Sequence, residues 1–339
     1  MNSPGNTAAV EERQMTARHI FSLVASELAL VEEEFGRQAR SNIQVIAYIG
    51  DYLRASGGKR VRPALTLLSA SAAGGDASRP NVVRMATVME FLHTATLVHD
   101  DIIDNAETRR NRPSINSRFG NQAAVLMGDW LYMSAFETSL QERSLTVLDI
   151  LTAVTRKMTE GELLQLTLLG RADVTEEQYF DVLRRKTAYL FSACCEIGSI
   201  LGGASPAQRR ALRDYGMNLG TAFQLVDDLL DFTSDEDALG KAAGADLLEG
   251  KVTLPVIYLL AKEPRMRSAV QSVMREGAYG EDGREALVRA AEKAGAVERA
   301  RACAASYAEA AVKSLEGVPP SKYTDGLRSI PAYILERET

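Results

Sequence analysis

The sequence predicts an all-α protein in which long helices surround a deep central cavity. Apolar residues recur at helical spacing along most of the 339 residues, and no segment shows the apolar–polar alternation of a β-strand. Two apolar runs, 91–104 and 223–231, each end in the pattern Asp-Asp-x-x-Asp. A helix that turns acidic only at its end belongs at the rim of a buried cavity, which a large helical assembly can enclose between facing helices.

Glycine, proline and polar residues mark the helix ends. Ser56-Gly57-Gly58 and Gly74-Gly75-Asp76 each end a helix, and Pro80 opens the helix of the first acidic run, with Asn81 as its N-cap. Polar loops are expected after the two acidic runs, at 105–121 and 234–251. Helices are expected at 18–34, 43–55, 64–73, 80–104, 123–141, 145–169, 176–201, 206–230 and 252–261, with weaker amphipathic helices over 264–315.

No linker long enough to separate domains lies between the two acidic runs, which look like partners. We therefore expect residues 18–339 to form a single all-α domain and residues 1–17 to form a flexible tail. Beyond Val318 the chain is expected to be partly ordered at best. Five apolar residues there are candidates for docking: Leu327, Ile330, Tyr333, Ile334 and Leu335.

Composition argues against several classes of function. The net charge of −6 argues against nucleic acid as a partner. Cys194, Cys195 and Cys303 form no disulfide framework or metal-ligand spacing, so we expect core residues in a reducing compartment. No apolar run approaches the ~18 residues of a membrane span, and the first fifteen residues carry no targeting signal. The expected location is the cytoplasm, with any membrane contact limited to a peripheral one during product release.

The two acidic runs predict a shared divalent-metal site. Asp100 and Asp104 are four residues apart and share a helix face, as do Asp227 and Asp231. Like charges at this spacing weaken a helix by about 0.2–0.5 kcal/mol, and a hard cation such as Mg²⁺, shared with substrate phosphates, would compensate. One such run is more often a solvated helix end. Two runs, each entered from an apolar stretch, favour the metal.

Basic residues beside the acids predict phosphate binding. Acids that hold a metal and bases at the neighbouring loops together describe a site for one diphosphate on the metal and a second on basic residues alone. Each basic stretch, taken singly, could equally serve capping or solubility. The stretches are GGKRVRP at 57–63, Arg109-Arg110, Lys186-Thr187, Lys241 and Lys251.

With these motifs in order, the sequence resembles the trans-isoprenyl diphosphate synthases, and most of all the all-trans long-chain polyprenyl diphosphate synthases that make quinone side chains. The resemblance runs from about residue 20 to the C-terminus. It departs from the family at Asn105, where an acid is usual, and at Asn111, where glycine is usual. The matching stretches are GGKRVRP (57–63), FLHTATLVHDDIID (91–104), RR (109–110), FGNQAAVLMGDWL (119–131), RKTAYLF (185–191), FQLVDDLLD (223–231), GK (240–241) and DLLEGKVTLP (246–255).

This resemblance implies the isoprenoid synthase helical fold, a homodimer and Mg²⁺-dependent head-to-tail (1'-4) condensation of isopentenyl diphosphate onto an allylic diphosphate such as farnesyl diphosphate. The implied products are all-trans chains of about C35–C50, made with three Mg²⁺ ions per site. The implied metal ligands are Asp100, Asp104 and Asp227, supported by Asp101, Asp228 and Asp231. The implied catalytic residues are Asp100, Asp104, Lys186, Asp227 and Lys241.

The resemblance also assigns the two substrates to separate residues. The allylic diphosphate would be bound by Arg109, Lys186, Thr187, Gln224 and Lys241. Isopentenyl diphosphate would be bound by Lys59, Arg62, His93 and Arg110. Lys251 would help to close the site.

Helix geometry adds an expectation for the histidines. His93 lies seven residues, or two turns, before Asp100 and so nearly on the same face, which favours a substrate contact. His99 lies off that face and is expected to be structural. Trp130 is expected to pack at the cavity wall.

The same helix predicts where the growing chain lies. A product anchored at Asp100 must extend back along the helix, past Thr96 and Ala95, which are small where short-chain members of the family carry aromatics. Met89, with Leu92 and Met85, is the candidate floor. Small residues at 95 and 96 could instead only let two helices approach closely.

Several alternatives remain. One is a shorter-chain farnesyl or geranylgeranyl diphosphate synthase, and another is a non-catalytic subunit of a heteromeric synthase, which should lack an acidic run. Head-to-head condensation or terpene cyclisation would not need GGKRVRP and His93. A helical metal buffer would not need apolar runs leading into the acids.

Overall fold

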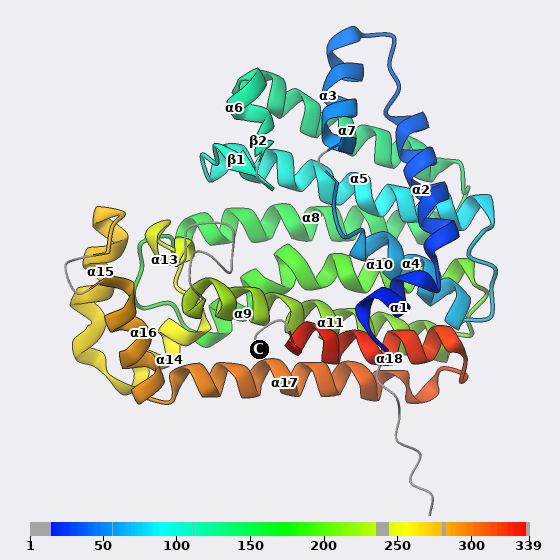
Figure 1. The fold of residues 1–339 in the computed structure, drawn as a ribbon. Helices are drawn as coiled ribbons and strands as arrows, with labels where there is room; N and C mark the ends of the chain where they lie inside the picture. The colour runs from blue at the N-terminus through cyan, green and yellow to red at the C-terminus, as the bar shows by residue number, and fades with distance from the viewer. Residues whose placement is uncertain (1–14, 56, 111, 235–243, 280–282, 337–339) are drawn as a thin grey trace, which may run out of the picture.

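The computed structural model describes residues 15–55, 57–110, 112–234, 244–279 and 283–336, and it confirms the all-α prediction (Figure 1). Within these residues the only sheet is a two-residue antiparallel ribbon, in which β1 (Thr108–Arg109) pairs with β2 (Arg112–Pro113). The helices of the first half are α1 (Ala17–Ser22), α2 (Ala25–Gln38), α3 (Gln44–Ala55), α4 (Val61–Ala72), α5 (Pro80–Ile103), α6 (Ile115–Phe119), α7 (Asn121–Leu140) and α8 (Leu145–Leu168).

The second half contains a π-helix, η1 (Arg184–Ala188), between two α-helices. Thr175 and Ser205 begin α9 and α11 with capping boxes, in which side chain and backbone satisfy each other's donors. The α-helices are α9 (Glu176–Leu183), α10 (Tyr189–Leu201), α11 (Pro206–Thr233), α13 (Ala245–Leu248), α14 (Leu254–Lys262), α15 (Arg267–Glu276), α16 (Gly283–Lys293), α17 (Ala296–Ser314) and α18 (Lys322–Leu335), with 3₁₀ turns η2 (Pro264–Met266) and η3 (Leu315–Gly317).

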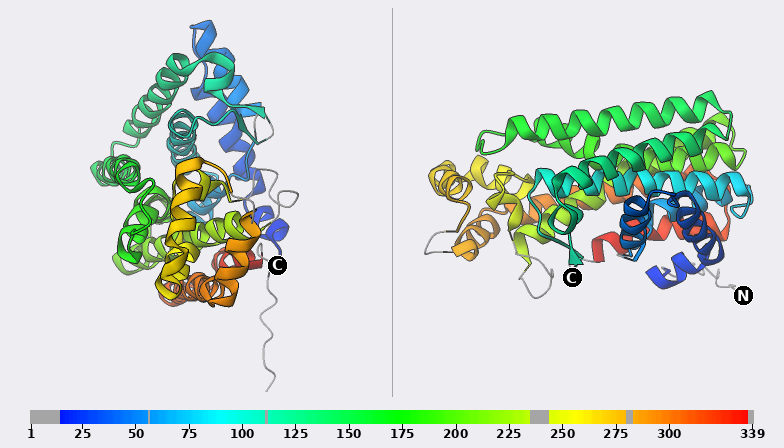
Figure 2. Two further views of the ribbon diagram at one scale, coloured as in Figure 1. Left: turned by 90° about the vertical axis from the view of Figure 1, so that its left-hand side faces the viewer. Right: turned by 90° about the horizontal axis from the view of Figure 1, so that it is seen from above.

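The helices α5, α8, α10, α11 and α17 run in roughly the same direction across the middle of the molecule (Figure 1). In both further views α8 lies on the opposite side of the molecule from α2 (Figure 2). None of the described helices combines the length and the apolarity needed to cross a membrane.

Helix α10 is packed closely against two neighbours through its glycines and theirs. A Cβ atom on Gly198 would lie 2.2 Å from the carbonyl oxygen of Thr66 on α4, and one on Gly216 of α11 would lie 2.6 Å from that of Phe191. Cys194 and Cys195 are fully buried on α10, as predicted for core residues, and Cys303 is half-buried. The approach of α4, α10 and α11 fixes the frame that carries the site.

Some predicted helix boundaries were wrong. The expected helix over 18–34 is two helices, because Val24 leaves the helical conformation. Arg79, not Asn81, precedes the first turn of α5, since Pro80 occupies the N1 position where its missing N–H costs nothing. Helices α6 and α13 lie inside segments expected to be loops.

The two ends of the chain also differ from expectation. The segment 322–335, expected to be partly ordered at best, is the helix α18, and the predicted docking of Leu327 and Ile334 is confirmed because both are buried. The Tyr215 hydroxyl donates to the carbonyl oxygen of Leu327 at 2.7 Å. At the other end, Ala17 already belongs to α1, and the rest of the expected tail up to residue 14 lies outside the described residues.

Candidate active site

A cavity of about 1510 Å³ lies between α4, α5, α7, α8, η1 and α11. It exceeds the roughly 300–1,000 Å³ of pockets for drug-sized ligands. The residues predicted for substrate and metal that line it are Lys59, Arg62, His93, Asp100, Arg109, Arg110, Lys186, Thr187, Gln224 and Asp227. Asp104 and Lys251 are not on the lining, and Lys241 and Asn111 lie outside the described residues.

The three carboxylates of the first acidic run point in different directions. Asp100 lines the cavity, and its pKa is raised to about 7, first by burial and then by the neighbouring Glu162 and Asp104. Asp101 accepts a hydrogen bond from Arg109 Nε at 2.6 Å. Asp104 forms an ion pair with Lys251, whose Nζ lies 3.2 Å from its carboxylate. Lys251 therefore joins the loop before α14 to the end of α5.

The second acidic run is divided in a similar way. Asp227 lines the cavity, whereas Asp228 is buried and accepts hydrogen bonds on both oxygens. Tyr179 donates to it at 2.6 Å and Gln224 Nε2 at 2.8 Å. Burial raises the pKa of Asp228, and these two hydrogen bonds oppose that shift. Asp231 accepts from the backbone N–H of Asp246 at 3.1 Å, which ties α13 to α11.

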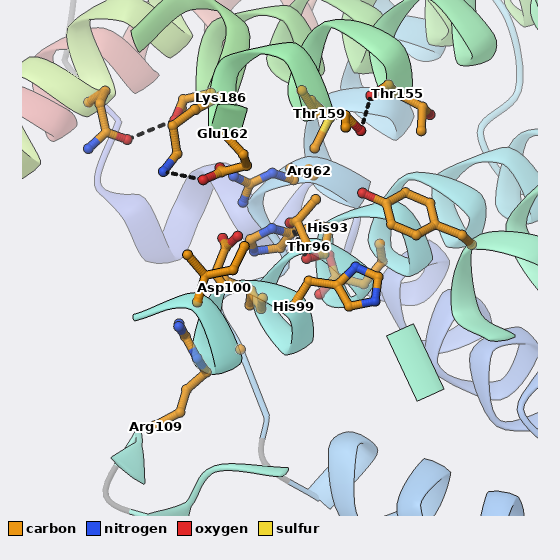
Figure 3. Close-up of a pocket in the computed structure, with 18 of the residues that line it drawn as sticks. Arg62, His93, Thr96, His99, Asp100, Arg109, Thr155, Thr159, Glu162 and Lys186 are labelled. Atoms are coloured by element: carbon orange, nitrogen blue, oxygen red, sulfur yellow. Dashed lines mark hydrogen bonds and ion pairs between the residues drawn. The ribbon is translucent and has the colours of Figure 1, made fainter. Parts of the chain in front are cut away.

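The π-helix η1 carries Lys186 and Thr187 to the cavity wall. Lys186 Nζ is held by two side chains of α8, at 2.9 Å from Gln165 Oε1 and 2.9 Å from Glu162 Oε2. Thr187 Oγ1 donates to Gln224 Oε1 at 2.8 Å. Figure 3 shows the Lys186–Glu162 pair across the cavity from Asp100. Single π-helical turns inside α-helices are frequent at functional sites. This turn places Lys186 at the cavity that the acidic helices α5 and α11 also line.

The basic side of the cavity begins at Arg60, whose left-handed φ of 49° precedes α4. Arg60 is paired with Glu32 and, at 2.6 Å, with the buried Glu90, so its charge is already compensated. Arg62 is different. Its guanidinium stacks on Phe191 at 5.1 Å, and its enclosed Nε finds no hydrogen-bond partner within the described part of the chain.

His93 lies beside this cation on the cavity lining. Burial lowers its pKa well below the usual value, and Arg62 and Arg110 lower it further. His93 is therefore neutral near pH 7 and can donate one hydrogen bond without adding charge. A half-buried arginine whose Nε has no hydrogen-bond partner among the described residues, next to a neutral donor, is suited to bind an anion.

The donor set suits a hard divalent cation. The groups at the acidic end are carboxylates, and the pKa of Asp100 is raised first by burial and then by the negative charges of Glu162 and Asp104. Among the described residues, no group of three or more His, Cys, Asp or Glu side chains is arranged to hold a metal ion. Asp100 and Asp227, the carboxylates of the two acidic runs that face the cavity, are the residues that would hold an ion shared with phosphate oxygens.

The predicted chain-length residues are separated by the structure. Thr96 lines the cavity, but Ala95 and Met89 are fully buried in the core and are not on the lining. At about 100° per residue, Ala95 lies some 140° around the helix from Asp100, and so faces the neighbouring helices. Met89 shares the face of Asp100 but lies three turns back, beyond the lining.

The apolar wall is built mainly by α7 and α8. Tyr132, Met133 and Phe136 line it from α7, and Met158, Leu163 and Leu166 from α8. Sequence reasoning did not identify these residues.

Two further expectations for the wall need correction. His99 also lines the cavity, contrary to the prediction that it lies off that face, although its Nε2 lies 3.2 Å from the Val125 carbonyl oxygen. Trp130 is half-buried and is not on the lining.

Sequence reasoning also missed four polar residues that hold the site together: Glu90, Glu162, Gln165 and Tyr179. Their partners lie on other helices, so no local spacing marks them. The one local signal is Gly161 beside Glu162, because a glycine inside a helix can mark a close approach of another segment. A Cβ at Gly161 would lie 2.7 Å from Arg185 Cβ, so α8 and η1 approach closely there.

The family model described as polyprenyl synthetase matches residues 43–290, more than half of the chain. This chain belongs to the polyprenyl synthetase family. The synthase is a prenyltransferase with the all-helical fold of that family, as the resemblance implied. A crystal structure of polyprenyl synthase from Caulobacter crescentus CB15, complexed with calcium and isoprenyl diphosphate, is similar to it with a TM-score of 0.90 at 33% identity, covering 96% of this chain and 99% of that one.

Relatives of the synthase differ in the product that their names give. Octaprenyl diphosphate synthase of Escherichia coli is 37% identical over 325 residues, covering 96% of this chain and 100% of that protein. A short chain isoprenyl diphosphate synthase of Methanothermobacter thermautotrophicus is 37% identical over 324 residues, covering 92% and 96%. Heptaprenyl diphosphate synthase component 2 of Geobacillus stearothermophilus is 35% identical over 324 residues, covering 96% and 100%.

Proposed function

We propose that this synthase adds isopentenyl diphosphate units head to tail, in 1'-4 linkage, onto an allylic diphosphate and makes long all-trans polyprenyl diphosphates. The observation that carries this proposal is the arrangement of one cavity. Asp100, Asp227 and Lys186 line one part of it, and Arg62 and His93 line another, so we assign one diphosphate to each part. The same cavity continues between the apolar residues of α7 and α8.

The allylic diphosphate is assigned to the acidic side. Mg²⁺, as three ions per site in our proposal, would supply the charge neutralisation that diphosphate needs as a leaving group. Asp100, Asp104 and Asp227 would hold it, and Asp104 would first have to exchange its ion pair with Lys251. Lys186 and Thr187 would bind the remaining phosphate oxygens, with Lys241 and Arg109.

The chemistry then follows from the geometry. The allylic C–O bond breaks and its electron pair leaves with diphosphate. The double bond of isopentenyl diphosphate, held by Lys59, Arg62, His93 and Arg110, attacks the cation and forms the new C–C bond. A proton passes to the departing diphosphate and restores an alkene. The apolar wall keeps out water, which would trap the cation as an alcohol.

Cavity size supports a long product. A volume of about 1510 Å³ and the small Thr96 on the lining leave room for a chain beyond the diphosphates. We propose products of about C35–C50, of the kind used for quinone side chains. The shorter-chain alternative keeps the same site and differs only in where the chain is stopped.

A product assay tests this function. The purified enzyme is incubated with labelled isopentenyl diphosphate, farnesyl diphosphate and Mg²⁺, and the chains are separated by chromatography. Products near C35–C50 are expected. Chains that stop at C20, one unit beyond the C15 primer, would support the short-chain alternative, and turnover only after addition of a second protein would support a heteromeric synthase.

We also propose a homodimer. Exposed apolar side chains gather on α7 and α8, and three of them, Met133 (62% exposed), Leu163 (60%) and Leu166 (45%), line the cavity as well. A second copy over this face would remove them from water and close the apolar wall. Light scattering measures the mass in solution.

The free cysteines fit the reducing cytoplasm.

Two alanine variants separate the substrate sites. Arg62→Ala is expected to raise the KM for isopentenyl diphosphate about tenfold or more, because the guanidinium lines the cavity and its Nε has no hydrogen-bond partner among the described residues. Lys186→Ala is expected to lower kcat and to weaken binding of the allylic substrate, because the lysine charge lies beside Asp100. Steady-state kinetics with each substrate varied in turn decide the matter. Equal effects of both variants on one substrate would contradict the partition.

A further inference from the structure

A line of hydrogen bonds runs from the π-helix at the cavity wall to the second acidic run, through Thr187 and Gln224 on the lining to Asp228 and Tyr179 behind it. Thr187 donates to Gln224 at 2.8 Å, and Gln224 donates to Asp228 at 2.8 Å. Tyr179 completes the line by donating to the other oxygen of Asp228 at 2.6 Å. Thr187, Asp228 and Tyr179 are all buried. The two ends of this line, Tyr179 and Thr187, come from the same continuous segment, α9 and η1.

We propose that Tyr179 is a positioning residue that fixes Asp227 relative to Lys186. The inference rests on the proposed function, because it assigns these two residues to one diphosphate. Tyr179 and Thr187 attach the α9–η1 segment to α11 at two points, Asp228 and Gln224. Lys186 lies next to one attachment and Asp227 next to the other.

The contacts of Asp228 explain why the tyrosine matters. Both carboxylate oxygens are occupied by protein donors, so Asp228 is held away from the cavity while its neighbour Asp227 faces it. Without the Tyr179 hydroxyl, one buried oxygen of Asp228 loses its donor. A buried carboxylate oxygen without a donor is costly, which favours rotation of Asp228 toward the cavity. Helix α11 also loses its second attachment to the segment that carries Lys186.

Packing of the ring itself does not depend on the hydroxyl. Tyr179 lies edge to face with Phe180 at 5.4 Å and is 7% exposed. Tyr179→Phe therefore keeps the ring in place and removes only the donor. Misplacement of a catalytic pair by about 1 Å can cost about 100-fold, and we expect a loss of about 10- to 100-fold from this single change.

The chain offers a matched control in Tyr258. Its hydroxyl donates to Glu176 Oε1 at 2.9 Å, and the residue is also buried. This pair joins α14 to the start of α9, and neither residue lines the cavity. Tyr258→Phe removes a tyrosine–carboxylate hydrogen bond that also reaches α9, at the partly exposed Glu176, without touching the site.

The test measures binding as well as turnover. Calorimetry with the non-ionising thio analogue of farnesyl diphosphate in Mg²⁺ gives the dissociation constant, kinetics give kcat and each KM, and thermal melting reports folding. Tyr179→Phe is expected to weaken binding of the analogue and to lower kcat, each by about 10- to 100-fold. The KM for isopentenyl diphosphate is expected to be unchanged. Tyr258→Phe is expected to bind and turn over as the wild type does.

A double variant checks that Tyr179 acts through Asp228. Asp228→Asn keeps the volume of the side chain. The double variant Tyr179→Phe/Asp228→Asn is expected to lose no more analogue affinity and kcat than Asp228→Asn alone. Wild-type affinity for the analogue in a folded Tyr179→Phe, or the same loss in Tyr258→Phe, would overturn the assignment. If Tyr179→Phe does not fold, a fully additive Asp228→Asn/Thr187→Ala pair would overturn it instead. An inactive wild type that still binds the analogue would count against the proposed function and leave this comparison intact.

Discussion

Replacement of Asp100 or Asp227 by alanine is expected to lower kcat by about 10²–10³-fold, the usual cost of losing one group that stabilises transition-state charge. The two residues come from different helices, α5 and α11, and both line the cavity. Each would hold cation against the departing diphosphate, so neither can replace the other. The measurement is single-turnover and steady-state kinetics with saturating Mg²⁺, farnesyl diphosphate and isopentenyl diphosphate.

The fold of these variants should be unaffected, because removing Asp100 relieves its repulsion with Glu162 and Asp104. Helical circular dichroism checks this point. Asp214→Ala is the matched control, since Asp214 is an exposed aspartate of α11 that forms an ion pair with its neighbour Arg213. Near-normal turnover in Asp100→Ala or Asp227→Ala would rule out a cluster shared by the two helices.

Thr96→Phe is expected to shorten the product from about C35–C50 to about C15–C20. Thr96 lies one helical turn, about 5.4 Å, before Asp100 on the cavity lining, so an aromatic ring there stands in the path of a chain anchored at the metal side. Chromatography of the labelled products measures the length. A folded, active Thr96→Phe that still makes the native product would contradict this path.

Ala95→Phe gives the complementary result. The sequence predicts that the product passes both Thr96 and Ala95, but Ala95 is fully buried among core helices and is not on the lining. Its enlargement is therefore expected to overpack the core and cost about 1–3 kcal/mol of unfolding free energy, with product length unchanged in the enzyme that remains folded. Thermal or denaturant unfolding measures this cost. A stable Ala95→Phe variant that makes short chains would instead identify position 95 as the one that limits chain length.

Much of the helical framework could be predicted because the information is local. Periodicity between residues three and four apart identified most long helices, and both acidic runs mark the cavity ends of α5 and α11. Local rules failed where distant packing decided the outcome. Helix α18 looked weak by itself, yet Leu327 is fully buried and its carbonyl oxygen accepts from Tyr215, which is 112 residues away.

The candidate site divides along the same line. The two acidic runs and the basic stretches were visible in the sequence, because charged residues beside apolar helices need a chemical reason, and the resemblance to the family then assigned roles to Asp100, Asp227, Lys186 and Arg62. Motif spacing could not distinguish Thr96 from Ala95. The two are adjacent in the chain, and only the directions of the neighbouring helices decide which of them faces the cavity.

By itself, the sequence determined that this protein is an all-helical prenyltransferase with two acidic runs and a basic approach to them. Only the tertiary structure decided which side chains hold those groups in place. Lys186 is held by Gln165, 21 residues earlier, and Asp228 by Tyr179, 49 residues earlier. Such pairs depend on the packing of whole helices, and a buried polar group accepts whichever partner that packing brings within hydrogen-bond distance.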